Sequence, residues 1–348
     1  MDGLDCCLAE ILLSTELNFN ILDFKTYSYD YKTIEKISNN IGTNNIEKVK
    51  SLDEYLGKIF SDISYKFLGN RKIDLIASHG QTIIHQNAKK SIQVGDPKYM
   101  HDRFKVPVVF NFRGKDILLG GTGAPLIPYL DWLLFKLNQK NTITLNIGGI
   151  SNITFIPSSG SRSDVLGFDV GPGMSLIDEY VKLKFNERLD YNSKYSFKGK
   201  ICYEMLDFLL KDEFVLSSPP KSTTREYFGL NYLKIIINKF SKLKKYDFLR
   251  TLVKFTAESI IYNINTYLEY DIDEIVVSGG GAHHTLLVKD LNENLSNLSF
   301  MDKYKISIDN KESFLMAILG YTCYNHIANN MPSVTGASNE AVYGEIYE

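Results

Sequence analysis

Five apolar runs in this sequence end in glycine-rich turns, and this repeated pattern constrains the fold more than any other feature. The runs have the length of buried strands, and glycine punctuates each of them at its end. Longer helical patterns lie between them, such as 248–270 with its apolar face. Strands that alternate with long helices predict an α/β protein with mixed sheets flanked by helices. The runs are KIDLIASHGQT (72–82), VPVVFNFRGKDILLGGTGAP (106–125), TITLNIGGISNITFI (142–156), VLGFDVGPG (165–173) and DEIVVSGGGAHH (273–284).

Length and composition narrow the class of protein. At 348 residues the chain suggests two domains, since ~100–200 residues per domain is usual. A formal net charge of -2 excludes a general nucleic-acid binder, which needs a basic excess. No apolar stretch approaches the ~18 residues of a membrane span, and no secretory signal is present. Four cysteines without a CxxC pair and six histidines without HExxH give no disulfide framework or zinc site, which fits a reducing cytoplasm.

Glycine turns after buried strands allow backbone amides to gather around an anion. The sequence has neither the GxxxxGK[ST] loop nor a convincing GxGxxG followed by an acidic residue, so a Walker-type or dinucleotide fold is disfavoured. The pattern therefore predicts a nucleotide site assembled from separate turns in two domains.

The stretch GFDVGPG (167–173) places Asp169 at the end of an apolar run, directly before a glycine turn. An aspartate in a purely structural turn caps a backbone amide from inside the turn. A carboxylate at a strand end beside glycine is common in α/β active sites, where ligands bind beyond the carboxyl edge of the sheet. From these residues alone, a structural turn and a site remain equally open.

Ordered blocks over nearly the whole chain resemble those of the anhydro-N-acetylmuramic acid kinase family, sugar kinases of the actin-like, hexokinase-like ATPase superfamily. The resemblance implies two actin-like (RNase H-like) α/β domains around a central cleft. It places the first domain at 1–128 plus 327–348, with its first strand missing, and the second at 129–326. The blocks include MDGLD (1–5), SHGQTIIH (78–85), NFRGKDILLGGTGAPLIP (111–128), NIGGISNIT (146–154), PKSTTREYF (220–228), SGGGAH (278–283), KESFLMAILGY (311–321) and MPSVTGA (331–337).

The resemblance also implies an activity. Members of this family add water to the anomeric carbon of 1,6-anhydro-N-acetylmuramic acid, and the released O6 takes the γ-phosphoryl group of ATP. The products are N-acetylmuramic acid 6-phosphate and ADP, in the recycling of cell-wall fragments. Such chemistry needs a base, Mg²⁺ to offset phosphate charge, and exclusion of bulk water. The implied partners are small molecules in the cytoplasm, with no nucleic acid or membrane, and a homodimer is left open.

Site residues follow from the matching blocks. Asp169 matches the catalytic base, with Asp178 as the other nearby carboxylate. Arg113 matches a sugar-contacting arginine suited to the lactyl carboxylate, against the alternative of a surface salt bridge with Asp116. Further substrate-binding residues are expected to be His79, Gln81 and Glu312, against the alternatives of a core histidine for His79 and a favourable helix start for Glu312.

The nucleotide is expected to contact a larger set of residues, and no residue is assigned as a protein ligand of a metal. Lys221, Ser222 and Arg225 resemble a family signature whose role the sequence does not reveal. The expected ATP-binding residues are Asp2, Gly3, Asp5, Asn146, Gly148, Gly149, Gly171, Gly173, Gly279, Gly280 and Gly281.

The chain departs from the family pattern at its start. The family's first nucleotide block reads SGTSxDGxD after a first strand, and here Met1 occupies the x. We expect an exposed strand edge and weakened ATP binding as a result. An inactive or merely sugar-binding remnant of the kinase is therefore the alternative function. Smaller departures are Met174, Thr224 and His284.

Overall fold

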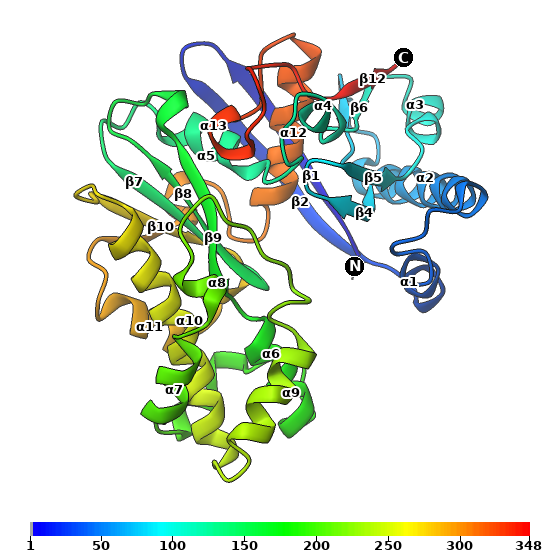
Figure 1. Ribbon diagram of the computed structural model, residues 1–348. Coiled ribbons are helices and arrows are strands. Elements are labelled where there is room, and N and C mark those ends of the chain that lie inside the picture. The colour runs from blue at the N-terminus through cyan, green and yellow to red at the C-terminus, as the bar shows by residue number, and fades with distance from the viewer. Residues whose placement is uncertain (1–2) are drawn as a thin grey trace. The chain divides into compact units, whose positions relative to one another are not determined.

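The computed structural model describes residues 3–348, and the chain divides into two compact units (Figure 1). Unit 1 comprises Met1–Leu134 and Asn310–Glu348, and unit 2 comprises Phe135–Asp309. The expected α/β architecture, with mixed sheets flanked by helices, is confirmed. The unit boundaries differ from those expected at 128/129 and 326/327, because helix α12 (Lys311–Tyr324) packs on strands of unit 1.

Unit 2 contains a five-stranded sheet in the order β11-β10-β7-β8-β9. The three strands β7, β8 and β9 form an antiparallel meander, whereas β10 and β11 run parallel to β7. As a result β7, β9 and β10 all end at the same edge of the sheet. The strands are β7 (Thr142–Ile147), β8 (Ile150–Ile156), β9 (Leu166–Pro172), β10 (Glu274–Ser278) and β11 (Leu298–Phe300).

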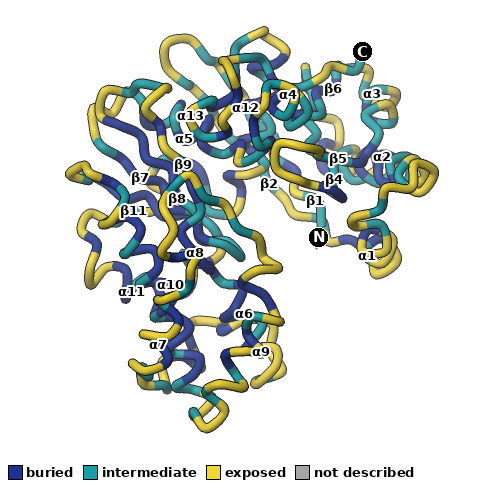
Figure 2. Tube along the Cα trace, in the orientation of Figure 1, coloured by how far each residue is buried: buried dark blue, intermediate teal, exposed yellow. Residues whose placement is uncertain are grey.

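Helix α10 (Lys245–Tyr267) forms the centre of the helical layer of unit 2 and packs on β9, α6, α7 and α11. Its expected apolar face is buried, as Figure 2 shows by its dark colour. The other helices are α6 (Ser175–Phe185), α7 (Tyr203–Leu209), α8 (Glu213–Leu216), α9 (Leu230–Lys239) and α11 (Thr285–Asn292), with short 3-10 turns at Arg162–Asp164, Tyr191–Ser193, Ser196–Lys198, Gly280–His283 and Met301–Tyr304.

Unit 1 contains three small sheets rather than one. They are the hairpin β1-β2, the sheet β12-β6-β3, in which β3 and β6 are parallel, and the hairpin β4-β5. The strands are β1 (Gly3–Leu13), β2 (Leu17–Ser28), β3 (Ile76–Ala77), β4 (Gln81–Gln86), β5 (Lys90–Val94), β6 (Val108–Phe110) and β12 (Glu345–Tyr347). The helices are α1 (Tyr31–Ser38), α2 (Ile46–Leu68), α3 (Lys98–Phe104), α4 (Gly114–Leu118), α5 (Ile127–Phe135), α12 and α13 (Pro332–Thr335).

A cavity of about 910 Å³ lies between β1 and β3 in unit 1. Its lining includes residues 4–11 of β1 and residues 71–80 around β3, and α12 packs on both strands. Unit 2 shows what an uninterrupted sheet of this plan looks like. There β7 lies between an antiparallel hairpin, β8-β9, and a parallel pair, β10-β11. Unit 1 has a hairpin and a parallel pair, but among its described residues no strand lies between them.

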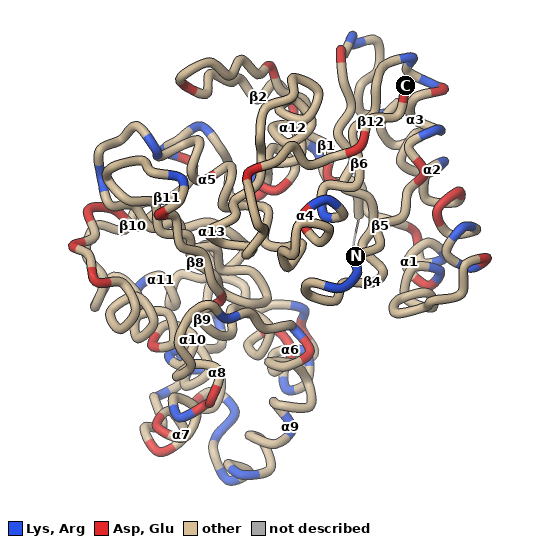
Figure 3. The backbone as a smooth tube through the Cα atoms, turned by 45° about the horizontal axis from the view of Figure 1, so that its top comes forward, with Lys and Arg blue, Asp and Glu red and all other residues tan. Residues whose placement is uncertain are grey.

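Charged residues of both signs are interspersed along the chain, as the alternating colours on α2 illustrate (Figure 3). Within residues 3–348, no helix combines the length and the apolar character that crossing a membrane would require.

The cavity in unit 1 suggests a stability test. We expect a strand of the length of β7, which has 6 residues, to pair with β1 and β3 when it is added at the N-terminus. The unpaired backbone groups at the edges of β1 and β3 would then form hydrogen bonds with the added strand. The apolar side chains that line the cavity would be removed from water. Each kcal/mol gained should raise Tm by roughly 2–4 °C, as measured by calorimetry. A glycine- and serine-rich extension of equal length is the control, and an equal Tm for both versions would contradict the expectation.

Candidate functional site

Two glycine turns of unit 2 are joined by backbone hydrogen bonds. The β7–β8 turn consists of Gly148 and Gly149, and the second turn follows β9. Gly148 O accepts from Met174 N at 2.8 Å, and Gly149 O accepts from Gly173 N at 2.9 Å. A Cβ atom on Gly173 would collide with the carbonyl oxygen of Gly148. The two turns can therefore approach this closely only because Gly173 has no side chain.

The third glycine turn, Gly279–Gly281, packs against the end of β7. Gly279 has φ +81°, and a Cβ there would lie 2.6 Å from Asn146 Oδ1. A Cβ on Gly281 would collide with the side chain of Ile147. Three turns thus meet at the carboxyl ends of β7, β9 and β10, which is the edge where α/β sheets bind ligands.

Some of these glycines are open to a ligand and others are packed. At Gly280 no atom lies within 4 Å of an added Cβ, and at Gly149 the three nearest atoms, from 3.4 Å, all belong to the side chain of Arg225. An added Cβ at Gly148 would make only an ordinary contact, with Ile150 O at 3.6 Å. At Gly171 an added Cβ would instead lie 3.0 Å from the Cβ of Ser259 in α10. The open backbone at 148, 149 and 280 is where a phosphate or an adenosine could approach.

The expected ATP-binding residues fall into two groups. Asn146 and all seven glycines from Gly148 to Gly281 gather at this edge of unit 2. Gly3 and Asp5 lie on β1 of unit 1, where Asp5 accepts a hydrogen bond from Thr26 Oγ1 at 2.5 Å. Asp2 lies outside the described residues.

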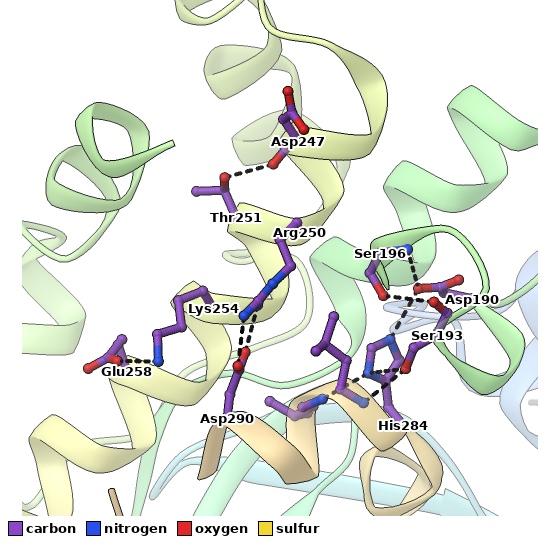
Figure 4. Close-up of polar contacts among 12 residues, drawn as sticks. Asp190, Ser193, Ser196, Asp247, Arg250, Thr251, Lys254, Glu258, His284 and Asp290 are labelled. Carbon is purple, nitrogen blue, oxygen red and sulfur yellow. Dashed lines mark hydrogen bonds and ion pairs between the residues drawn. The ribbon is translucent and has the colours of Figure 1, made fainter. Parts of the chain in front are cut away.

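His284, which departs from the family pattern, fixes the end of the third turn (Figure 4). Its Nδ1 accepts from Leu287 N at 3.2 Å and so caps α11, while its Nε2 lies 3.3 Å from Asp190 Oδ2. The same Asp190 accepts from the backbone amides of Tyr195 and Ser196. Because Nδ1 accepts a hydrogen bond, it is the ring nitrogen without a proton. The side chain links the glycine turn to the 190–196 loop.

A bidentate ion pair secures α11 against α10 (Figure 4). Arg250 Nη1 and Nη2 donate to Asp290 Oδ2 and Oδ1 at 2.6 and 2.7 Å. Asp290 is buried, so this planar pairing is better protected from screening than an exposed salt bridge. It holds the helix that follows the third turn.

Asp169 lies in the middle of β9 rather than at the expected strand end. It is half-buried, and a distant loop holds its carboxylate. Ser222 Oγ and Thr223 N both donate to Asp169 Oδ2, at 3.0 and 2.8 Å. Asp169 N donates in turn to Lys221 O at 3.2 Å. Burial raises the pKa of Asp169, and the two hydrogen bonds and the Lys221 charge oppose that rise. Oδ1 accepts no hydrogen bond from the residues that the structure describes.

Lys221 anchors this loop to the end of α8. Its Nζ donates to Phe214 O and Val215 O, both at 3.0 Å. Burial lowers the pKa of Lys221 to about 8, against the opposing effect of Asp169 and Asp212. Lys221 and Ser222, two residues of the family signature without an assigned role, therefore form hydrogen bonds with Asp169. The sequence does not reveal these contacts, because about 50 residues separate the two segments.

Asp178, the other nearby carboxylate, is half-buried. It lies in the first turn of α6, whose N-cap is Met174, and its Oδ1 is buried without a hydrogen-bond partner among the described residues. Burial raises the pKa of Asp178 to about 6, and Arg225 is the first of the charges that oppose the rise. Met174 packs against the apolar core of unit 2.

In unit 1, Arg113 and His79 form a defined pair. Arg113 Nε donates to His79 Nε2 at 3.1 Å, and Arg113 Nη1 donates to Gly123 O at 2.8 Å. Because a guanidinium only donates, His79 Nε2 is unprotonated and its Nδ1–H donates to Gly80 O at 2.9 Å. Among the described residues nothing accepts from Nη2, which leaves that edge for a ligand.

The electrostatics agree with this protonation state. Burial lowers the pKa of His79 to about 4, and the Arg113 charge adds to the effect. Burial lowers the pKa of Arg113 to about 10, while Glu312 and Asp116 oppose the shift. His79 is partly exposed and both its ring nitrogens have partners, so its role in binding the sugar stays a prediction.

The alternative of a surface salt bridge between Arg113 and Asp116 is wrong. Asp116 is fully buried, and it accepts from Gly123 N, Thr335 Oγ1 and Tyr343 Oη. Asp116 therefore fixes the loop that contains Gly123. The carbonyl oxygen of Gly123 accepts a hydrogen bond from Arg113 and so orients the guanidinium.

The remaining substrate candidates lie in unit 1 with Arg113. Glu312 is exposed in the first turn of α12, a favourable place for a carboxylate, and its charge acts on Arg113. Gln81 opens β4, and its Nε2 donates to Thr82 O at 3.1 Å. Within residues 3–348 no group of three or more histidine, cysteine or carboxylate side chains could hold a metal ion.

Comparisons with known proteins place this geometry in context. The sequence model of a family described as anhydro-N-acetylmuramic acid kinase matches residues 1–348. A kinase of that name from Clostridioides difficile is 36% identical over 373 residues, which cover 99% of this chain and 95% of the relative. Its namesake from Francisella tularensis subsp. novicida is 36% identical over 364 residues, with coverage of 99% and 95%. A solved structure of a putative N-acetylmannosamine kinase from Listeria monocytogenes matches with 12% identity and a TM-score of 0.39, over 92% of this chain and 100% of that one.

Asp178 gives a test of the electrostatics beside the turns. Its folded pKa is raised from 3.8 to about 6, so the stability it contributes is present below the unfolded pKa and is lost as pH rises through the folded one. We expect Asp178→Asn to gain unfolding free energy relative to the unchanged chain between those two pH values, and the gain to level off above them. Urea denaturation over this pH range measures the difference. The exposed Asp207→Asn is the control for loss of one negative charge, and a flat difference for Asp178→Asn would contradict the expectation.

Proposed function

The chain belongs to the anhydro-N-acetylmuramic acid kinase family, and from this membership we propose that it opens 1,6-anhydro-N-acetylmuramic acid with water and phosphorylates O6. Family membership makes it a sugar kinase with ATP as co-substrate. The products would be N-acetylmuramic acid 6-phosphate and ADP, in the cytoplasmic recycling of cell-wall fragments. The observation that carries the proposal is Asp169, whose Oδ2 is held by two donors while Oδ1 accepts no hydrogen bond from the described residues.

Asp169 would act as the general base. Water attacks the anomeric carbon, the bond from that carbon to O6 breaks, and Oδ1 accepts the proton of the water. O6 then forms a bond to the γ-phosphorus as the bond to the ADP oxygen breaks. Partial burial supports this role, because it raises the pKa of Asp169 and makes its carboxylate a stronger base than an exposed one.

Arg113 would bind the lactyl carboxylate of the sugar through Nη2. Its Nε and Nη1 are already engaged by His79 and Gly123, so the guanidinium is oriented before a ligand arrives. Such preorganisation lowers the cost of binding. Glu312 and Gln81 would contact the sugar hydroxyls. His79, whose ring nitrogens are engaged by Arg113 and Gly80, would act by orienting Arg113.

The three glycine turns of unit 2 would hold ATP. The open backbone at Gly148 and Gly149 suits phosphate, and the open Gly280 suits the adenosine. Mg²⁺ would enter on the phosphates of ATP, since it is commonly held by substrate phosphates and one or two carboxylates. Among the described residues, no group of three or more histidine, cysteine or carboxylate side chains is placed to bind it.

Replacement of the base is the first test. Asp169→Asn keeps nearly the same size, but its amide cannot usefully accept a proton. We expect turnover to fall by at least ~10²–10⁴-fold, while sugar binding persists because Arg113 is untouched. Ring opening and phosphorylation should fall together, as measured by ADP release and by incorporation of labelled water into the product. Near-normal turnover of Asp169→Asn, with loss in Asp178→Asn, would identify the other carboxylate as the base.

The same assay separates the kinase from the alternative of a sugar-binding remnant. A chain that binds the anhydro-sugar in calorimetry but releases no ADP at any ATP concentration would be such a remnant. ATP-dependent release of ADP that requires the sugar would support the kinase.

The second test concerns the carboxylate of the sugar. Arg113→Lys loses the planar donor set, and charge-assisted hydrogen bonds are worth enough that kcat/KM for the sugar should fall roughly 10- to 100-fold. KM for ATP should not change. The anhydro-sugar without its lactyl group is the matched control substrate, since it should discriminate little between the two proteins. An equal loss with both substrates would contradict the assignment of Arg113 to the carboxylate.

A further inference from the structure

We propose that Ser222 and the backbone amide of Thr223 form a positioning clasp that fixes Asp169 by one carboxylate oxygen and presents the other to water. The inference rests on the proposed role of Asp169 as a base. It assigns a role to residues whose family signature had none in the sequence analysis.

The geometry of the clasp distinguishes the two oxygens of Asp169. Both donors meet Oδ2, the hydroxyl of Ser222 at 3.0 Å and the Thr223 amide at 2.8 Å. Two donors on one oxygen set the plane of the carboxylate and its side-chain rotation. The lone pairs of Oδ1 then point in one direction, which a base needs if it is to meet water in a defined orientation.

Further hydrogen bonds anchor the loop that carries the clasp to α8. The Nζ of Lys221 donates to two carbonyl oxygens at the end of α8. Asn263 of α10 donates to Val215 O and to Val170 O of β9, so the same anchor reaches the strand that carries Asp169. The position of Ser222 is therefore set by buried contacts, although its own side chain is exposed.

The charges around Asp169 give the clasp a definite effect on pH dependence. Lys221 is the charged group that acts on Asp169, and Lys221 in turn feels Asp212. Of the packed elements, β8 pairs Asn152 with Asp169, and α10 brings Ser259 to Gly171 and Asn263 to Val170. None of these three side chains carries a charge. The hydrogen bonds to Oδ2 favour the ionised form, so their loss must raise the pKa of Asp169.

Ser222→Ala is the main test, read out by NMR of the side-chain carboxyl carbons of labelled aspartates, with Asp169→Asn to assign the signal. We expect the pKa of Asp169 to rise in Ser222→Ala. The acid limb of kcat/KM should move to higher pH with it, because the base must be ionised to act. The plateau above the limb should stay within about tenfold of the unchanged enzyme, in contrast to the ~10²–10⁴-fold loss in Asp169→Asn. Sugar KM should not change.

Two variants control for a merely structural effect. Ser222→Thr keeps the hydroxyl and should restore both the pKa and the acid limb. Ser217→Ala removes another exposed serine hydroxyl of the same segment, one that donates to Phe214 O at 2.8 Å and does not touch Asp169, and it should leave both unchanged. Lys221→Met, which releases the anchor and removes the positive charge, should also raise the pKa of Asp169.

The outcomes separate the clasp from the proposed function. An unchanged pKa of Asp169 in both Ser222→Ala and Lys221→Met would overturn the clasp. A raised pKa without any movement of the acid limb would support the clasp and overturn Asp169 as the base. The NMR measurement needs no turnover, so it decides the first question even where the chain is inactive.

Discussion

The close approach of three backbone turns at the carboxyl end of β7 is the constraint on which the rest of unit 2 depends. Gly148 O and Gly149 O accept hydrogen bonds from the turn after β9, and Gly279 lies against Asn146 at the end of β7. Any side chain at Gly173 or Gly281 would push these turns apart. The glycines therefore serve the packing first, and the open backbone at 148, 149 and 280 is a consequence of that packing.

Asp169 and Asp178 show how environment separates two carboxylates of one segment. Both are partly buried, and burial raises the pKa of each. Asp169 has two donors on one oxygen, whereas the buried oxygen of Asp178 has no hydrogen-bond partner among the described residues and is balanced mainly by the charge of Arg225. A carboxylate that two donors fix by one oxygen is suited to oriented proton transfer, whereas Asp178 bears the cost of a buried oxygen without a hydrogen bond among the described residues.

The sequence predicted those features that depend on local pattern. The strand runs that end in glycine and the apolar face of α10 follow from periodicity and turn chemistry. Asp169 was expected at the end of its strand, but β9 continues to Pro172 and Asp169 pairs with Asn152 in its middle. The sequence could not show that Ser222 meets Asp169, or that His284 caps α11 and reaches Asp190, because such contacts depend on how distant segments pack. The boundary at α12 was misplaced for the same reason: an apolar helix does not indicate which of two sheets it covers.

The two units share one plan, and they differ between β1 and β3 of unit 1. In unit 2, β7 lies between a hairpin and a parallel pair, and its carboxyl end organises all three glycine turns. In unit 1 a cavity of about 910 Å³ occupies the corresponding place between β1 and β3. Among the described residues, the strand that carries Gly3 and Asp5 pairs with β2 alone. The backbone donors and acceptors at the other edge of β1 must therefore be satisfied by water or by another strand.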